Sequence, residues 1–196
     1  MKKKLVATML TLLAVATIAA CGKSGGTSTS DSSSTSSTSS KELNKQEHTR
    51  DVQRIGSDEY GYITIPKDWL PFRDLKGGDD IQYTDGTGYN IVTLNAFTRE
   101  KANIEAGEEL TAEMIANRIY YSWEGNTNVD EIWGAKTTVS GHETFQVNVI
   151  MKSGQYLISW LFKEGDKVYL IVFEGSKEVL AEMIDDIEHT WSKEKD

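Results

Sequence analysis

The sequence predicts an α+β fold with an antiparallel β-sheet of about six or seven strands packed with helices. Near the C-terminus, three apolar-alternating segments follow one another across short turns that contain glycine, which is typical of an antiparallel meander. Two amphipathic helices flank this region instead of alternating with single strands, so the element order differs from a repeated βαβ unit. We expect the globular domain to occupy residues 51–196, with order beginning near Ile55.

The first part of this domain predicts a strand followed by a hairpin. Residues 60–66 alternate between two faces, and Pro66 ends the strand because proline has no N–H to donate. Two segments are then joined by an Asp-Gly turn, which favours antiparallel pairing. The expected order is strand 60–66, turn 67–72, strand 81–84, hairpin turn 85–88 and strand 89–98.

A helix is predicted after a charged, irregular excursion. Thr111 is a suitable N-cap, and Gly125 ends the helix. Its apolar residues recur at helical spacing on one face. They are Ala112, Ile115, Ala116, Ile119 and Trp123. A polar loop over 126–131, a strand over 132–139 and a turn at 140–142 are expected next.

The clearest pattern is the meander itself. Residues 145–151 place apolar side chains at every second position, and the segments 156–162 and 168–173 have long apolar runs that indicate burial on both faces. Ser176 then caps a final helix, in which Leu180, Met183, Ile184, Ile187 and Trp191 share a face. We expect Glu188 on its solvated side and a frayed end at residues 192–196.

These elements together resemble the PsbP-like superfamily. The first strand ends Ile63-Thr64-Ile65-Pro66-Lys67-Asp68-Trp69, and a central helix, a meander and a C-terminal helix follow, so that the resemblance spans residues 58–191. It implies an α/β/α sandwich. The superfamily includes photosystem accessory proteins, a Ran-binding nuclear-transport factor and many bacterial lipoproteins, but no functional motif of these relatives is matched residue by residue here.

The N-terminus resembles a bacterial lipoprotein signal peptide. Basic residues 2–4 precede an uncharged run, residues 5–20, that ends in Ile18-Ala19-Ala20-Cys21, a sequence similar to the lipobox. The resemblance implies cleavage between Ala20 and Cys21 and a diacylglyceryl group, often joined by palmitate, on Cys21. At about 1.5 Å per residue this run spans about 24 Å, less than the ~30 Å hydrocarbon core, which favours a cleaved signal peptide over a spanning helix.

Residues 21–50 are expected to be a disordered tether. Ser and Thr dominate residues 23–40, which therefore have no apolar surface to bury. A flexible coil of this length has an r.m.s. reach of roughly 25 Å. The tether is interpreted as a spacer that holds the domain away from the membrane on its extracytoplasmic side.

Charge and cysteine content exclude several functions. The formal net charge is −9, and it becomes −12 once the three lysines of the signal peptide are removed. Such an acidic chain is not suited to nucleic acid or to lying flat on anionic lipid, because both require a basic surface. Cys21 is the single cysteine, so the folded part has no disulfide and no cysteine nucleophile.

Sequence spacing gives no strong catalytic, cofactor or metal site. His48, His142 and His189 lack zinc-site spacing. The segment 140–143, Ser-Gly-His-Glu, contains catalytic residue types but is interpreted as a turn. A weak Ca²⁺ site remains an alternative for the acidic loop, since carboxylates supply calcium ligands. Its candidate ligands are Asp79, Asp80 and Asp85.

Aromatic residues are the remaining binding candidates. Tyr120 and Tyr121 are adjacent in the first helix and cannot both face the sheet. One exposed tyrosine beside Trp133 would form a binding surface, with core packing as the alternative. We therefore expect a non-catalytic, membrane-anchored accessory module that acts through protein contact. A small-molecule or carbohydrate receptor and a hydrolase remain alternatives.

The lipobox interpretation predicts that Cys21→Ala leaves the chain without its lipid. Because the thiol is the attachment point, the variant should not incorporate radiolabelled fatty acid and should change its membrane fractionation. Normal incorporation by Cys21→Ala would show that the lipobox interpretation is wrong.

Overall fold

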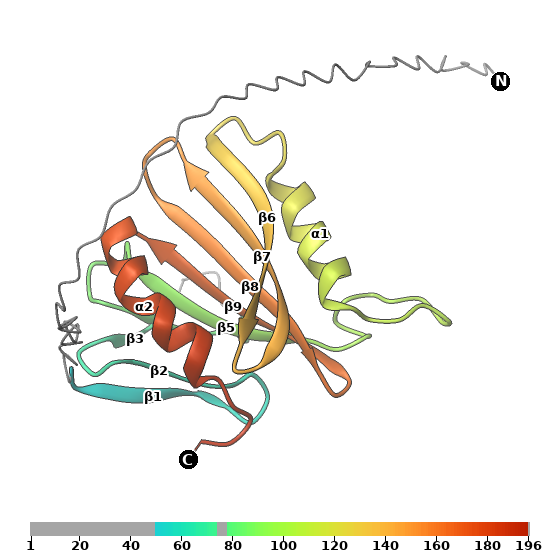
Figure 1. Cartoon of the computed structure of the whole chain (residues 1–196), viewed down its shortest axis with the longest axis horizontal. Helices are drawn as coiled ribbons and strands as arrows, with labels where there is room; N and C mark the ends of the chain where they lie inside the picture. Colours follow the sequence, from blue (N-terminus) through green and yellow to red (C-terminus); the bar gives the residue numbers. More distant parts are fainter. Residues whose placement is uncertain (1–49, 74–77, 196) are drawn as a thin grey trace, which may run out of the picture. The chain divides into compact units, whose positions relative to one another are not determined.

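The computed structural model describes residues 50–73 and 78–195, which belong to one compact unit, Glu47–Asp196. Figure 1 shows the course of the chain through this unit. The signal peptide with Ala20, and residues 21–49 of the tether with Cys21 and His48, lie outside the described residues. Neither described helix has the length and apolar character needed to cross a bilayer.

The elements follow the predicted order with additions near the start. The strands are β1 (Val52–Ser57), β2 (Gly61–Pro66), β3 (Leu70–Phe72), β4 (Ile81–Thr84), β5 (Ile91–Phe97), β6 (Val129–Val139), β7 (His142–Met151), β8 (Tyr156–Glu164) and β9 (Lys167–Gly175). The helices are α1 (Ala112–Trp123) and α2 (Lys177–Thr190).

The main sheet has seven strands in the order β3-β4-β5-β9-β8-β7-β6, and all neighbours are antiparallel. Strands β1 and β2 form a separate two-stranded antiparallel sheet. The predicted α+β class, the antiparallel sheet and the meander β7-β8-β9 are therefore confirmed.

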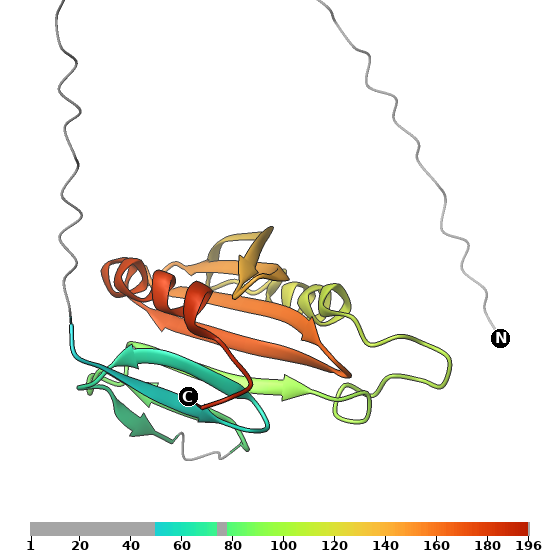
Figure 2. The same ribbon diagram turned by 60° about the horizontal axis from the view of Figure 1, so that its bottom comes forward.

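Alternating side chains of the central strands fill two cores, one on each face of the main sheet. Trp160 of β8 packs with α2, β1 and β2, whereas the next residue, Leu161, packs with α1. Both side chains are fully buried, as the uninterrupted apolar run of β8 predicts. Figure 2 shows the β1–β2 hairpin beside α2. The main sheet lies between α1 on one face and α2 on the other, and the small β1–β2 sheet lies in the same layer as α2.

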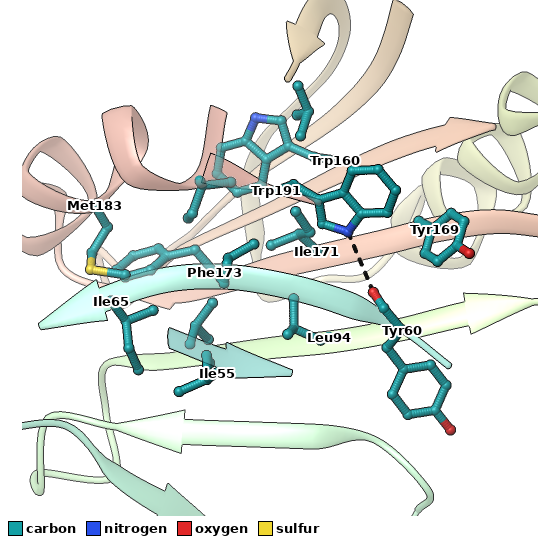
Figure 3. Packing of buried hydrophobic residues seen from close by; sticks show 14 of the residues in the cluster. Ile55, Tyr60, Ile65, Leu94, Trp160, Tyr169, Ile171, Phe173, Met183 and Trp191 are labelled. Atoms are coloured by element: carbon teal, nitrogen blue, oxygen red, sulfur yellow. Dashed lines mark hydrogen bonds between the residues drawn. The ribbon is translucent and has the colours of Figure 1, made fainter. Parts of the chain in front are cut away.

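Trp191, directly after α2, joins three parts of the first core. Its ring centroid lies 4.7 Å from that of Phe162 and 4.8 Å from that of Tyr169, and its Nε1–H donates to the Tyr60 carbonyl at 3.4 Å (Figure 3). At Gly61 a Cβ would lie 2.3 Å from the Trp191 ring nitrogen, so only glycine fits there. The indole therefore fixes how α2, the β1–β2 hairpin and the meander pack together.

Strand boundaries differ from the sequence prediction in three places. Residues 52–57 form β1, because they pair with β2 although their own pattern of burial is weak. The expected turn over 67–72 contains the short edge strand β3. Strand β6 begins at Val129, inside the expected polar loop, through a β-bulge between Val129 and Glu131.

Two predictions about the end of the chain are wrong. Glu188 is half-buried, and its carboxylate accepts hydrogen bonds from the Trp160 Nε1–H at 3.1 Å and the Thr137 hydroxyl at 3.3 Å. The expected frayed end is ordered over residues 192–195. Ser192 exchanges backbone hydrogen bonds with Tyr62 at 2.8 and 3.0 Å, and Lys193 pairs with Glu164. Long-range partners override the polar local sequence.

Replacing Trp191 by alanine should remove the contact that joins these layers. Trp191 is 5% exposed, so Trp191→Ala is expected to lower the free energy of unfolding by about 3–5 kcal/mol in urea denaturation. Tyr121→Ala is the matched control, because that ring is 67% exposed and its loss should cost less than about 0.5 kcal/mol. Equal effects of the two changes would contradict the assigned role of Trp191.

Glu174 predicts a pH dependence of stability. It lies opposite Leu157 and Ile91 in the sheet, and burial raises the pKa of its carboxyl. Because the folded state favours the protonated form, the stability present below the ordinary pKa of about 4.3 is lost as pH rises through the folded pKa.

Glu174→Gln should therefore raise the melting temperature at pH 7, and this gain should disappear below pH ~4. The exposed control Glu59→Gln should change it at neither pH. A gain for Glu174→Gln that is the same at both pH values would refute this explanation.

Candidate functional site

Strand β6 forms one edge of the main sheet, and no described segment pairs with its outer side (Figure 1). Its hairpin with β7 turns through Ser140 at φ 46° and Gly141 at φ 83°, the backbone of a two-residue type I′ turn. In such a hairpin the flanking pair, Val139 and His142, exchanges both hydrogen bonds. The pattern then alternates, so Ile132, Gly134 and Lys136 direct their N–H and C=O groups outward.

The register also fixes which side chains share a face. Gly134 is opposite Val147, and Lys136 is opposite Phe145, on the face covered by α1. Trp133 is opposite Asn148, on the other face, and it is 41% exposed.

Helix α1 contributes the two predicted tyrosines. Thr111 caps the helix by accepting the Met114 N–H at 3.1 Å, as expected. Tyr120 is half-buried against the second core, whereas Tyr121 is 67% exposed. Their rings meet edge to face with centroids 5.8 Å apart. The structure thus brings Tyr120 and Tyr121 together, but it places Trp133 on the opposite face of the sheet.

A groove of about 360 Å³ lies between α1 and the β6–β7 edge. Its lining is mostly apolar, with one cation at the rim. The residues are Ala116, Asn117, Tyr120, Gly134, Ala135, Lys136, Phe145, Gln146 and Val147. The volume is at the lower end of the range for small-ligand sites.

Gly134 keeps this groove open. Its φ is not positive, and a Cβ there would find its nearest heavy atom, the Gln146 carbonyl oxygen, at 3.9 Å. Neither backbone conformation nor crowding therefore requires glycine at this position. Since glycine weakens a strand interior, its effect here is to leave space beside Val147 and Phe145.

Lys136 sets the charge at the rim of the groove. Its Nζ lies 2.8 Å from a Glu143 carboxylate oxygen and 4.6 Å from the centroid of the Phe145 ring. The hydrogen bond with Glu143 raises the pKa of Lys136 and so favours the charged amine further. Both partners of the ion pair are well exposed, and an incoming carboxylate can compete with Glu143 at little cost.

A second, more polar cleft of about 660 Å³ lies between α2, the ends of β1 and β2, and the Asp85 turn. Charged residues surround Trp69 in its wall. They are Arg50, Asp51, Lys67, Asp68, Asp85 and Glu182.

The acidic loop does not assemble a metal site in the described residues. Asp79 pairs with Lys101 at 3.0 Å, and the hydrogen bond from Lys101 lowers the pKa of Asp79. Asp80 accepts from Asn95. Asp85 instead accepts from the Thr87 hydroxyl at 2.6 Å and from Asn90 at 2.6 Å, which closes its own turn.

The Ser-Gly-His-Glu segment is the β6–β7 turn, as predicted. The His142 ring nitrogens face the Val139 carbonyl at 3.1 Å and the Glu164 carboxylate at 3.2 Å. Neither nitrogen is therefore directed at Ser140. His189 lies on α2, where its Nδ1 is 2.9 Å from the Asp185 carbonyl.

Comparison with solved structures identifies a similar fold. The cyanobacterial PsbP protein of Synechocystis sp. PCC 6803 matches with a TM-score of 0.52 and 12% identity, over 72% of this chain and 91% of its own. This domain has a PsbP-like fold. At this identity the likeness concerns the fold alone.

Two other solved structures are more distant, and no family model and no curated protein sequence matches the chain. The Ran-binding protein Mog1p of Saccharomyces cerevisiae has a TM-score of 0.43 at 9% identity, covering 72% of this chain and 86% of its own. LpqN of Mycobacterium tuberculosis, described as involved in cell envelope biogenesis, has a TM-score of 0.40 at 8% identity, covering 70% and 87%.

Sequence reasoning missed Gly134, Lys136 and Phe145 as parts of one surface. Gly134 interrupts an otherwise regular strand, and such a glycine marks either a bulge or a place that another group approaches closely. That signal was available in the sequence. The sequence did not reveal that β6 is an edge strand, because strand order depends on pairings between distant segments.

The open space at Gly134 predicts tolerance to a larger side chain. Gly134→Val should leave the free energy of unfolding unchanged or raise it by up to about 1 kcal/mol, because valine favours strands. Gly61→Val should instead destabilise the fold strongly, since its Cβ would meet Trp191. Chemical denaturation measures both, and similar losses would show that the groove is not open space.

Proposed function

We propose that this protein is a lipid-anchored, extracytoplasmic binding module that acts through protein contact. The lipobox resemblance and the polar tether support the anchor, which would sit on the outer face of the cell membrane through Cys21. The fold likeness to PsbP supports an accessory domain without assigning it a partner.

One observation carries the proposal: an unpaired strand edge lies beside an apolar groove. β6 offers outward N–H and C=O groups, and the groove next to it has room for a side chain. Adding a strand to a sheet edge gives affinity through main-chain hydrogen bonds, and pockets for alternate side chains give specificity. Exposed Tyr121 adds a rigid aromatic residue of the kind enriched in such contacts.

The test is crosslinking of the full-length protein in its own cells, followed by affinity purification and identification of what is bound. Gly134→Leu should abolish capture because leucine occupies the groove, and Tyr121→Ala should weaken it several-fold. Tyr89→Ala is the matched control, since this tyrosine is 40% exposed but belongs to the turn between β4 and β5. Capture that is unchanged in Gly134→Leu would refute this contact surface.

The 660 Å³ cleft favours a second candidate function, a small-molecule or carbohydrate receptor. Its volume is typical of ligand sites, and the carboxylates in its wall offer hydrogen-bond acceptors. A thermal-shift screen with neutral sugars tests it. Stabilisation that is lost in Asp68→Asn and Glu182→Gln would support the receptor, and no stabilisation by any sugar would count against it.

A further inference from the structure

We propose that the partner bound at the β6 edge is a second copy of this chain. The two β6 strands would pair antiparallel about a twofold axis that passes beside Trp133 and is perpendicular to the sheet. The result is one continuous sheet across two molecules. This inference rests on the proposed function, because it names the occupant of the same contact surface.

The backbone of β6 suits such symmetric pairing. A twofold axis perpendicular to the sheet keeps both α1 helices on one side, so residues that face each other must project from the same face. Ile132, Gly134 and Lys136 project from the α1 face and direct their backbone groups outward. With the axis beside Trp133, Ile132 of each copy faces Gly134 of the other, and each of these pairs exchanges two hydrogen bonds.

This register places a side chain in each groove. Ile132 is half-buried against the second core of its own molecule, and Gly134 of the facing copy lacks a side chain, so in this register the remaining exposed part of the isoleucine covers the glycine. A bulky residue that covers a strand glycine is a known device for fixing strand register. Helix α1 packs mainly on β7 and β8 and also contacts β6 beside the groove, and no described strand pairs with the outer side of β6.

Charges in this register are complementary. Counting along the strand, Lys136 of one copy comes opposite the bulge at Asp130 of the other, and the symmetry repeats this approach. Asp130 is exposed and is the extra residue of the β-bulge between Val129 and Glu131. The pair places the rim cation of each groove opposite a carboxylate. The two symmetric approaches of opposite charge also offset part of the repulsion between two acidic molecules.

Trp133 occupies the other face at the axis. In this register the two Trp133 residues form the central pair without backbone hydrogen bonds, the type in which side chains approach most closely. Each Trp133 is 41% exposed in the single chain. Contact between two aromatic rings at such a pair stabilises a sheet.

Neighbouring registers lose these matches. Moving the axis to Gly134 places glycine opposite glycine, leaves both grooves empty and sets Lys136 against Ile132. Moving it to Ile132 sets the Asp130 carboxylate against the apolar groove. Of these three registers, the axis beside Trp133 is the one that both fills the grooves and pairs the charges.

The tether of the same chain is a poorer occupant. Between Cys21 and Leu43 it contains no aliphatic or aromatic residue, so this segment has no side chain that fills an apolar groove. A second copy supplies one from β6 itself.

Disulfide trapping of the full-length protein tests the register. In Trp133→Cys the two thiols would lie in a directly facing pair with Cα atoms about 4.5 Å apart, within the range for a disulfide. We expect a covalent dimer on mild oxidation. Exposed Glu131→Cys is the matched control on the same face, because its two copies would lie about 13 Å apart and should not crosslink. The unmodified chain measures any background from Cys21.

Sedimentation of the full-length protein in detergent measures the association itself. Asp130→Lys should weaken dimerisation by about tenfold, because two symmetric pairs become repulsive, and Asp130→Lys with Lys136→Asp should restore it. A monomer at all concentrations, with no Trp133→Cys disulfide, overturns the second-copy inference. Crosslinking of Glu131→Cys as efficient as that of Trp133→Cys overturns the register.

The two proposals fail differently. If the chain is monomeric but another protein is captured and lost in Gly134→Leu, the binding module stands and the second-copy inference falls. If Gly134→Leu neither changes capture nor disrupts a dimer, the groove is not a contact surface and both fall.

Discussion

Trp191 packs against Phe162 and Tyr169 of the meander while its Nε1–H donates to the Tyr60 carbonyl, so one side chain joins α2, the β1–β2 hairpin and the main sheet. This contact covers one face of the sheet. The other face is covered by α1 together with Ala102, Ile104 and Leu110 of the segment before it. The strand order leaves β6 at the edge of the sheet, and the groove lies where α1 meets this edge.

A long exposed strand edge is a hazard unless it is protected or used. Here the edge carries a charged residue, Lys136, and a bulge, both of which discourage indiscriminate pairing. The same features select one partner and one register when the facing strand offers an apolar residue opposite Gly134 and a carboxylate opposite Lys136. Protection against aggregation and recognition of a partner thus use the same side chains.

Local patterns in the sequence were sufficient for much of the fold. The meander, both helix caps at Thr111 and Ser176, and the class of the fold could be predicted from alternation and spacing. Strand β1 could not be predicted in this way, because its residues are held by pairing with β2. The burial of Glu188 could not be predicted either, because it depends on a hydrogen bond from Trp160, far away in the chain.

The candidate site was only partly predictable for the same reason. Helical periodicity predicted that Tyr120 and Tyr121 face different environments. It could not place Trp133 on the opposite face of the sheet, since that depends on the register between β6 and β7. The groove at Gly134 arises where α1 and β6 meet, and no local sequence pattern specifies that contact.

Amide hydrogen exchange resolved by residue, recorded on the full-length protein over a range of concentrations, tests the role of the β6 edge most directly. The amides of Trp133 and Ala135 bond to β7 and should be protected at every concentration. Those of Ile132, Gly134 and Lys136 point outward and should be protected only when the chain is concentrated. If these outward amides exchange rapidly at all concentrations, the β6 edge is not paired and the central claim is contradicted.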